Sequence, residues 1–350
     1  MSVLEYKCPS CGGTLLFDST AQKMKCPYCD SAYDVKDLSD SGQPQPDIFK
    51  IESKELNPEE REGMTVYSCP SCGGEIVGDK NTAATFCLFC GNTAIMPKQL
   101  TGMLRPDLII PFKVTEKAAQ DALKAFYKGK VLLPAVFQSQ NRIESIKGIY
   151  VPFWLFDCEA GASIQYKATT VQVWSDKNYN YTKTDYFQLF REGGANFEYV
   201  PADASTKMDD TYMESIEPYN YAEAIDFNTA YLSGYFADKY DVDSDAAKHR
   251  ADERIKSSII NLFQSTVMGY TSCIPESVNL NFSHGKLRYA LLPVWMLNTK
   301  YNGKIYTFAM NGQTGRFVGA LPMSWSKFFL WFLCLFLGLG AVGTLIVVLL

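Results

Sequence analysis

The same cysteine spacing occurs twice in the first hundred residues, and it constrains the fold more than any other feature. Each copy reads C-x2-C, fourteen intervening residues, and a second C-x2-C. The eight cysteines are Cys8, Cys11, Cys26, Cys29, Cys69, Cys72, Cys87 and Cys90. Four thiolates in two close pairs form the tetrahedral ligand set of structural zinc. The sequence therefore predicts two zinc ribbons, at residues 5–34 and 66–98, each with one Zn2+ ion.

The composition of the ribbons favours metal over disulfides. Each frame is too short to bury a self-sufficient core, so metal has to supply the folding energy, about 10–16 kcal/mol for structural zinc in such peptides. Disulfides are the alternative, but no signal peptide precedes the first frame, and C-x2-C pairs are typical of reduced proteins. Gly73 and Gly91 follow cysteines where the turn favours positive φ, while Asp30 takes the place of Gly91 in the first frame. Four sulfur ligands leave no open position for water, so the predicted metal is structural.

The C-terminal segment is the second strong constraint. Residues 328–350 form a run of 23 residues without a charged side chain. As a helix this run is about 35 Å long, enough to cross a hydrocarbon core of about 30 Å. Lys327 lies on its near side, and the positive-inside rule then keeps the N-terminal body in the cytoplasm. We expect a single-pass transmembrane helix; a buried helix of a soluble domain is the alternative.

The remaining chain divides by composition into a linker and one larger domain. Residues 35–65 carry eight acidic and four basic side chains and read as an acidic linker, with a short ordered stretch at residues 48–51. The two ribbons are therefore expected to be independent of each other. Residues 101–322 are expected to form an α+β cytoplasmic domain with a largely antiparallel sheet.

Hydrophobic periodicity places the main elements of this domain. A helix is expected after Thr115, and a longer one from Ser244. The apolar stripe of the longer helix consists of Ala247, Ala251, Ile255, Ile259, Leu262 and Phe263. The expected strands are 149–157 and 163–174, joined through Gly161, then 186–190, 196–200, 289–297 and 304–310.

No catalytic motif is present in the sequence. It contains no P-loop, no G-x-S-x-G and no H-E-x-x-H. Asp209–Asp210 and the acidic residues of 241–245 read as solvated turns, and Cys158, Cys273 and Cys334 as free thiols. We therefore expect a protein that is not an enzyme. Nucleic-acid binding is the alternative function of the ribbons, but the net charge is −5 and neither ribbon carries a cluster of Lys and Arg.

The whole pattern resembles a known bacterial family. The paired CPxCGG ribbons, the stretches GIYVPFWLFD, YLSGYFADKYDV and YALLPVWMLNTKYNGKIYTFAMNGQTGRFVG, and the apolar C-terminus carry the resemblance. They are similar to the YdjG-like, TFIIB-type zinc-ribbon membrane proteins, which are encoded beside a phage-shock-protein-A homologue. Some relatives carry the label primosomal replication factor Y, although no helicase motif is present here. The resemblance implies a bacterial cell membrane protein of envelope-stress systems that recruits a soluble cytoplasmic protein partner.

Overall fold

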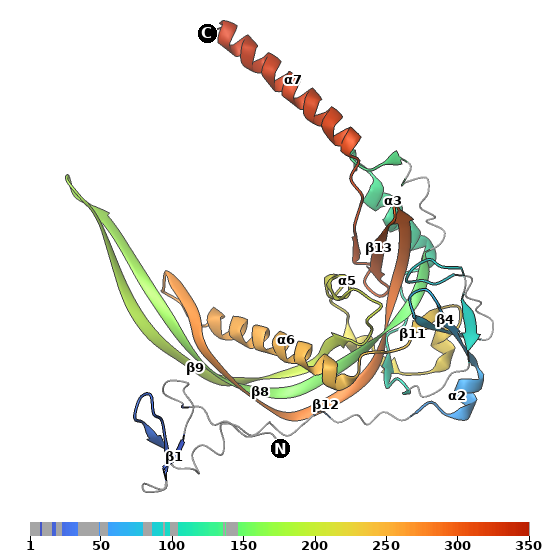
Figure 1. Cartoon of the computed structure of the whole chain (residues 1–350), viewed down its shortest axis with the longest axis horizontal. Coiled ribbons are helices and arrows are strands. Elements are labelled where there is room, and N and C mark those ends of the chain that lie inside the picture. The colour runs from blue at the N-terminus through green and yellow to red at the C-terminus, as the bar shows by residue number, and fades with distance from the viewer. Residues whose placement is uncertain are drawn as a thin grey trace. The chain divides into compact units, whose positions relative to one another are not determined.

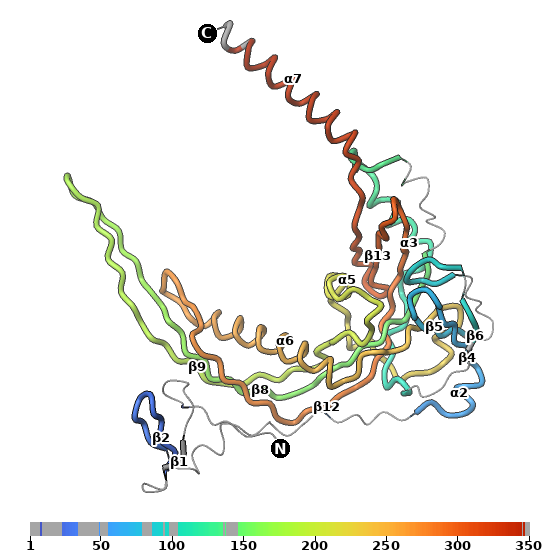
Figure 2. Tube along the Cα trace, viewed as in Figure 1, coloured from blue at the N-terminus to red at the C-terminus, as the bar shows by residue number. Residues whose placement is uncertain are grey.

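The chain forms two compact units, Met1–Ile48 and Phe49–Leu350. The computed structural model describes residues 8, 16–18, 23–33, 49, 55–79, 86–93, 95–98, 104–135, 137 and 146–349 (Figures 1 and 2). In the first unit, three short strands form an antiparallel sheet: β1 (Leu16–Asp18), β2 (Lys23–Lys25) and β3 (Ala32–Tyr33). Each unit is described by itself below.

The larger unit is built on one mixed sheet in which antiparallel pairs predominate. Its strands follow the order β10-β7-β12-β8-β11-β5-β4-β6; β13 and β14 continue from β12, and β9 pairs with β8. Parallel pairing occurs between β11 and β8 and between β12 and β7. The strands are β4 (Met64–Ser68), β5 (Glu75–Asp79), β6 (Met96–Lys98), β7 (Leu108–Ile109), β8 (Lys147–Ser175), β9 (Asn180–Asp203), β10 (Ile225–Asp226), β11 (Phe236–Asp238), β12 (Ser272–Tyr301), β13 (Lys304–Asn311) and β14 (Phe317–Gly319). This arrangement confirms the predicted α+β class.

Three strands are much longer than the sequence suggests, and one of them is β12, which has 30 residues where only 289–297 were expected. Residues 149–157 and 163–174 were expected as two strands joined at Gly161, but both lie in the single 29-residue strand β8. Gly161 pairs with Gly194 of β9 on one side and with Asn281 of β12 on the other. A glycine inside a strand marks a close approach or a bend as well as a turn, and here the strand continues through it. The short strands expected at 186–190 and 196–200 likewise belong to the one strand β9.

The helices follow their caps and apolar stripes. Helix α3 (Glu116–Tyr127) starts at Thr115, whose side chain accepts a hydrogen bond from the backbone N–H of Ala118. Helix α6 (Ser244–Ser265) is capped by Asp243 and lies along β9 (Figure 1). The buried residues of its predicted stripe are Ala247, Ala251, Ile255, Ile259 and Phe263. The sixth predicted member, Leu262, is exposed, because its position falls outside the face that meets the sheet.

Short elements occupy the chain between these parts. Residues 207–240 contain α5 (Asp210–Ser215), the 3-10 helices η2 (Tyr221–Glu223) and η3 (Thr229–Leu232), and the strands β10 and β11. The expected linker at 35–65 holds α2 (Pro58–Glu62), which starts with a capping box between Asn57 and Glu60. Phe49 is buried and packs edge-on against Phe156 at 5.1 Å between ring centroids. Residues 34–48 and 50–54 lie outside the described part of the chain.

The chain ends in helix α7 (Trp325–Leu349), which is long and apolar enough to cross a membrane. None of its most apolar stretch is buried against the rest of the structure. Its start is attached to the loop after α3, since the backbone N–H of Ser324 donates to Leu132 O at 2.9 Å. The Lys327 ammonium group donates to Leu133 O at 2.7 Å.

Candidate metal centres

The second cysteine cluster consists of Cys69, Cys72, Cys87 and Cys90, whose four sulfur atoms all lie within 4.8 Å of one another. The Sγ atoms of Cys69 and Cys90 are 3.7 Å apart, and those of Cys72 and Cys87 are 3.6 Å apart. Four sulfurs bound tetrahedrally to zinc at about 2.3 Å would be about 3.8 Å apart. The cluster therefore has the spacing that a tetrahedral metal site requires.

Two identical turns present these sulfurs. The backbone N–H of Gly73 donates to Cys69 O, and that of Gly91 donates to Cys87 O, each at 2.9 Å. Gly73 and Gly91 have φ values of 72° and 74°, which confirms the left-handed conformation expected from the sequence. Each turn folds backbone N–H groups around the sulfur of its first cysteine. Burial acts to raise the pKa of the Cys69 thiol, but hydrogen bonds from the backbone of Cys72 and Ser71 outweigh it and lower that pKa to about 7.

The second cluster is part of the main hydrophobic core. Cys69 and Cys87 are buried in the same apolar cluster as Ile149 and Val151 of β8. Strand β5, which follows the first turn, pairs with β11, and β11 pairs with β8. The sequence predicts that the two ribbons are independent of each other and leaves open whether either contacts the α+β domain. For the second ribbon the structure shows this contact, because its strands β4, β5 and β6 continue the sheet of the larger unit.

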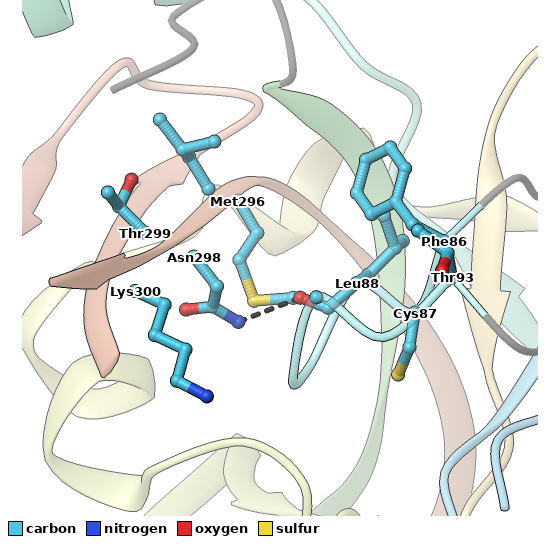
Figure 3. A pocket seen from close by; sticks show the side chains of 10 residues that line it. Phe86, Cys87, Leu88, Thr93, Met296, Asn298, Thr299 and Lys300 are labelled. Atoms are coloured by element: carbon cyan, nitrogen blue, oxygen red, sulfur yellow. Dashed lines mark hydrogen bonds between the residues drawn. The ribbon is translucent and has the colours of Figure 1, made fainter. Parts of the chain in front are cut away.

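A side chain from β12 also joins the second cluster to the domain. The Asn298 amide nitrogen donates to Leu88 O at 2.7 Å (Figure 3). It also donates to Phe89 O at 2.9 Å. Both acceptors lie in the turn between Cys87 and Cys90. Spacing along the sequence gives no sign of this contact, because more than 200 residues separate Asn298 from the turn.

The first cysteine cluster lies in the smaller unit and is more exposed. The sulfur atoms of Cys8, Cys26 and Cys29 lie within 4.8 Å of one another, and the Sγ atoms of Cys8 and Cys29 are 3.6 Å apart. The predicted fourth ligand, Cys11, lies outside the described residues. Asp30 has a φ of 58° and donates its backbone N–H to Cys26 O at 3.0 Å, so it takes the part that Gly91 has in the second cluster.

A buried acidic cluster forms a second polar feature of the larger unit, and the sequence did not reveal it. The side chains of Asp203 and Asp238 are both buried next to Ser205. The Ser205 hydroxyl donates to Asp238 Oδ2, and the Ser205 backbone N–H donates to Asp203 Oδ1 at 3.0 Å. Each aspartate is the last residue of its strand, β9 or β11, and follows an alanine, so neither periodicity nor spacing marks it as buried.

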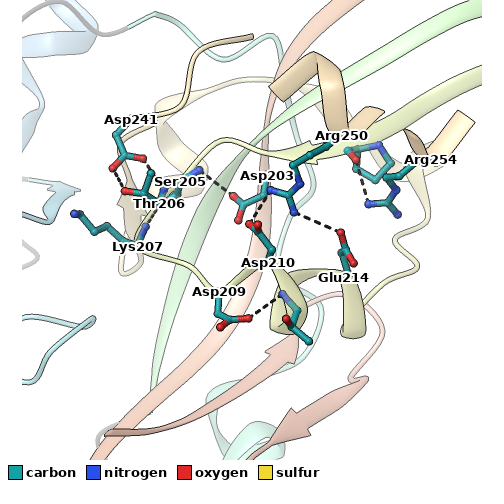
Figure 4. Close-up of polar contacts among 12 residues, drawn as sticks. Asp203, Ser205, Thr206, Lys207, Asp209, Asp210, Glu214, Asp241, Arg250 and Arg254 are labelled. Carbon is teal, nitrogen blue, oxygen red and sulfur yellow. Dashed lines mark hydrogen bonds and ion pairs between the residues drawn. The ribbon is translucent and has the colours of Figure 1, made fainter. Parts of the chain in front are cut away.

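The acidic residues that the sequence did single out have structural roles. Asp209 caps α5, and Asp210 forms an ion pair with Arg250 of α6 at 2.7 Å (Figure 4). Thr206 donates hydrogen bonds to the Asp241 carboxylate through its backbone and its hydroxyl. These contacts hold the segment after β9 against α6 and the segment after β11.

The fold and the clusters define a class of protein: a mixed α+β protein with two N-terminal cysteine clusters able to hold metal ions and a C-terminal helix able to span a membrane. No family model and no solved structure matches the chain. Its sequence is 36% identical to the uncharacterized protein YdjG of Bacillus subtilis (strain 168) over 330 residues, 94% of this chain and 93% of that protein. The chain belongs to the family of YdjG.

The buried acidic cluster makes stability depend on pH. The pKa of Asp203 is raised to about 7, chiefly by burial and also by Asp210, although the Ser205 N–H and Arg250 act to lower it. In the unfolded chain an aspartate has a pKa of about 3.9. The folded state therefore keeps a proton that the unfolded state releases, so stability falls as the pH rises from about 4 through 7.

We predict that Asp203→Asn removes part of this dependence. From pH 5 to pH 8 the wild-type chain should lose about 2–3 kcal/mol of unfolding free energy through Asp203. In the variant, the drop in unfolding free energy from pH 5 to pH 8 should be smaller by about that amount. Urea titrations of the detergent-solubilised protein at both pH values measure it. Asp226→Asn, which changes an exposed aspartate of β10, is the control and should keep the wild-type dependence. An equal loss in Asp203→Asn and wild type would contradict the prediction.

Proposed function

We propose that the protein is a zinc-ribbon adaptor, anchored in a bacterial cell membrane by α7, that recruits a soluble protein to the cytoplasmic face. A role in envelope stress fits this proposal. The observation that carries it is the different placement of two cysteine frames with the same spacing. The second frame lies in the core of the larger unit, whereas the first belongs to a separate compact unit.

This difference in placement assigns a stabilising role to the second cluster and leaves the first cluster for recognition of a partner. The second cluster stabilises the sheet, so its presence is explained without a partner. The described cysteines of the first cluster belong to the other compact unit, yet they keep the ligand spacing of the second cluster. A small knuckle held by a metal presents a rigid surface at a low entropic cost. Tyr28, in the turn between Cys26 and Cys29, is 77% exposed and offers an aromatic contact for a partner.

The β8–β9 hairpin offers a second docking contact for the partner, beside the one on the first ribbon. Strand β12 pairs with β8 as far as Thr169, whereas β8 and β9 continue to pair up to Ser175 and Asn180. This extension carries exposed apolar side chains, among them Val173, Trp174 and Tyr179. Exposed apolar patches of this kind mark interaction sites. Two linked contacts would strengthen binding by raising the effective concentration for the second one.

Zinc is the metal that the ligand chemistry favours. Four cysteine sulfurs in tetrahedral spacing suit zinc or iron–sulfur chemistry, and C-x2-C pairs in short ribbons are typical of structural zinc. Lys327 lies in the first turn of α7, and Arg316 lies before the helix. Their positive charge supports an orientation with both cysteine clusters in the cytoplasm.

We predict about two zinc ions per purified chain. Cys8→Ser and Cys69→Ser should each reduce the content by about one, because three sulfurs hold zinc much less tightly than four. Elemental analysis of the detergent-solubilised chain checks this. A coloured protein that contains iron, or a single zinc per wild-type chain, would contradict it.

We predict that the first ribbon is required for recruitment. Affinity capture from membranes should recover a specific soluble protein with the wild-type chain, and about tenfold less of it with Tyr28→Ala or Cys8→Ser. Tyr231→Ala, which changes an exposed tyrosine of the larger unit, should capture as much as wild type. The partner should also move to the cytosol in cells that carry the Tyr28→Ala chain.

Capture that is the same in all variants would contradict the adaptor. The alternative is a membrane-tethered protein that binds nucleic acid through its ribbons. It would be favoured if the chain bound single strands in gel shifts and lost them steeply with salt.

A further inference from the structure

A cavity lies directly before the membrane-spanning helix. It has a volume of about 360 Å³, and its walls come from the loop 129–133 after α3 and from residues 321–323. Helix α7 begins at Trp325, two residues after Met323, so chain connectivity alone places the cavity beside the start of α7. The hydrogen bonds from Ser324 to Leu132 and from Lys327 to Leu133 fix the loop and the helix start to each other.

The walls of this juxtamembrane cavity are apolar. Leu132, Leu133, Leu321, Pro322 and Met323 contribute most of the lining, and Lys130 is its one charged residue among those the structure describes. The apolar surface continues outside the cavity, because Val131, Met323 and Trp325 are 54%, 43% and 63% exposed. Side chains of this type are unfavourable in water but suit the boundary between lipid headgroups and acyl chains. The cavity therefore opens onto a surface that is continuous with the apolar surface of α7.

Along the described chain, the charged residues nearest to the cavity walls are lysines, and one of them, Lys130, is part of the lining. Lys128 and Lys130 are exposed in the loop after α3, and Lys130 also lies over the Phe126 ring at 5.6 Å. No aspartate or glutamate occurs between Asp121 and Glu144, nor after Arg316. Each lysine held near an anionic membrane surface contributes about 1 kcal/mol of attraction. The arrangement combines an apolar slot with cations at its mouth, which matches the two ends of an anionic lipid.

We propose that the juxtamembrane cavity binds one anionic phospholipid from the bilayer that α7 spans. Part of an acyl chain packs against Leu132, Leu321 and Pro322, and the phosphate pairs with Lys128 and Lys130. The volume lies within the usual range of small-ligand sites. The proposal rests on the membrane location proposed above and does not depend on the adaptor role. A bound lipid would fix the domain at the membrane surface beside its own anchor.

The test measures which lipids the full chain retains. The protein is reconstituted in nanodiscs that contain equal amounts of phosphatidylcholine and phosphatidylglycerol, then extracted gently and analysed by native mass spectrometry. Wild type should retain one phosphatidylglycerol per chain in preference to phosphatidylcholine. Lys128→Gln/Lys130→Gln should reduce that preference about 10–30-fold. Lys177→Gln/Lys183→Gln, at the exposed tip of the β8–β9 hairpin, is the matched control and should keep it.

A second variant tests the cavity itself. Leu132→Trp fills the slot and keeps both lysines, so it should lose the retained lipid while the metal content stays that of wild type. Equal retention of the two lipids by wild type, or unchanged retention in both the lysine variant and Leu132→Trp, would overturn the lipid site. Release of the full chain from membranes by sodium carbonate would instead overturn the membrane anchor, and the lipid site with it.

Discussion

The larger unit depends on four thiols that meet inside its main hydrophobic core. Cys69 and Cys87 lie among the apolar side chains of β8, so a metal held there crosslinks residues near the N-terminus to the centre of the sheet. Strand β11 lies between β5 and β8 and transmits this link through backbone hydrogen bonds. Without a metal, the site would have to bury four thiols whose turns point N–H groups at sulfur. The second cluster is therefore a structural part of the domain, and a metal bound there would contribute to folding.

The sequence was most informative where a short stretch of residues is by itself compatible with only one structure. Cysteine spacing predicted the second cluster, Thr115 predicted the start of α3, and an uncharged run predicted α7. Sequence-based prediction failed where the local structure is determined by pairing between residues that are far apart in the sequence. Gly161 has the local character of a turn, yet partners on two neighbouring strands keep it extended. The Asn298 contact and the buried Asp203 arise in the same way, from segments that meet only in the folded sheet, so no periodicity or spacing could indicate them.

One cysteine frame, used twice, thus serves two purposes in our account. The second copy stabilises the domain that carries α7, and the first copy is left as a separate unit with an exposed aromatic side chain. An anchored, stable domain and a small rigid recognition unit are what an adaptor at a membrane requires. In our proposal, the loop after α3 adds a polar and apolar surface at the start of α7, which would orient the domain on a bilayer.

Hydrogen exchange of the full chain tests the central claim most directly, because it reports the protection of each strand. The account predicts that Cys69→Ser raises exchange in β5, β11 and the first half of β8, since these strands share the core with the second cluster. Cys8→Ser should raise exchange only within residues 1–48. If Cys69→Ser affected residues 64–98 alone and left β11 and β8 as protected as in wild type, the second cluster would be an independent ribbon and the account would be contradicted.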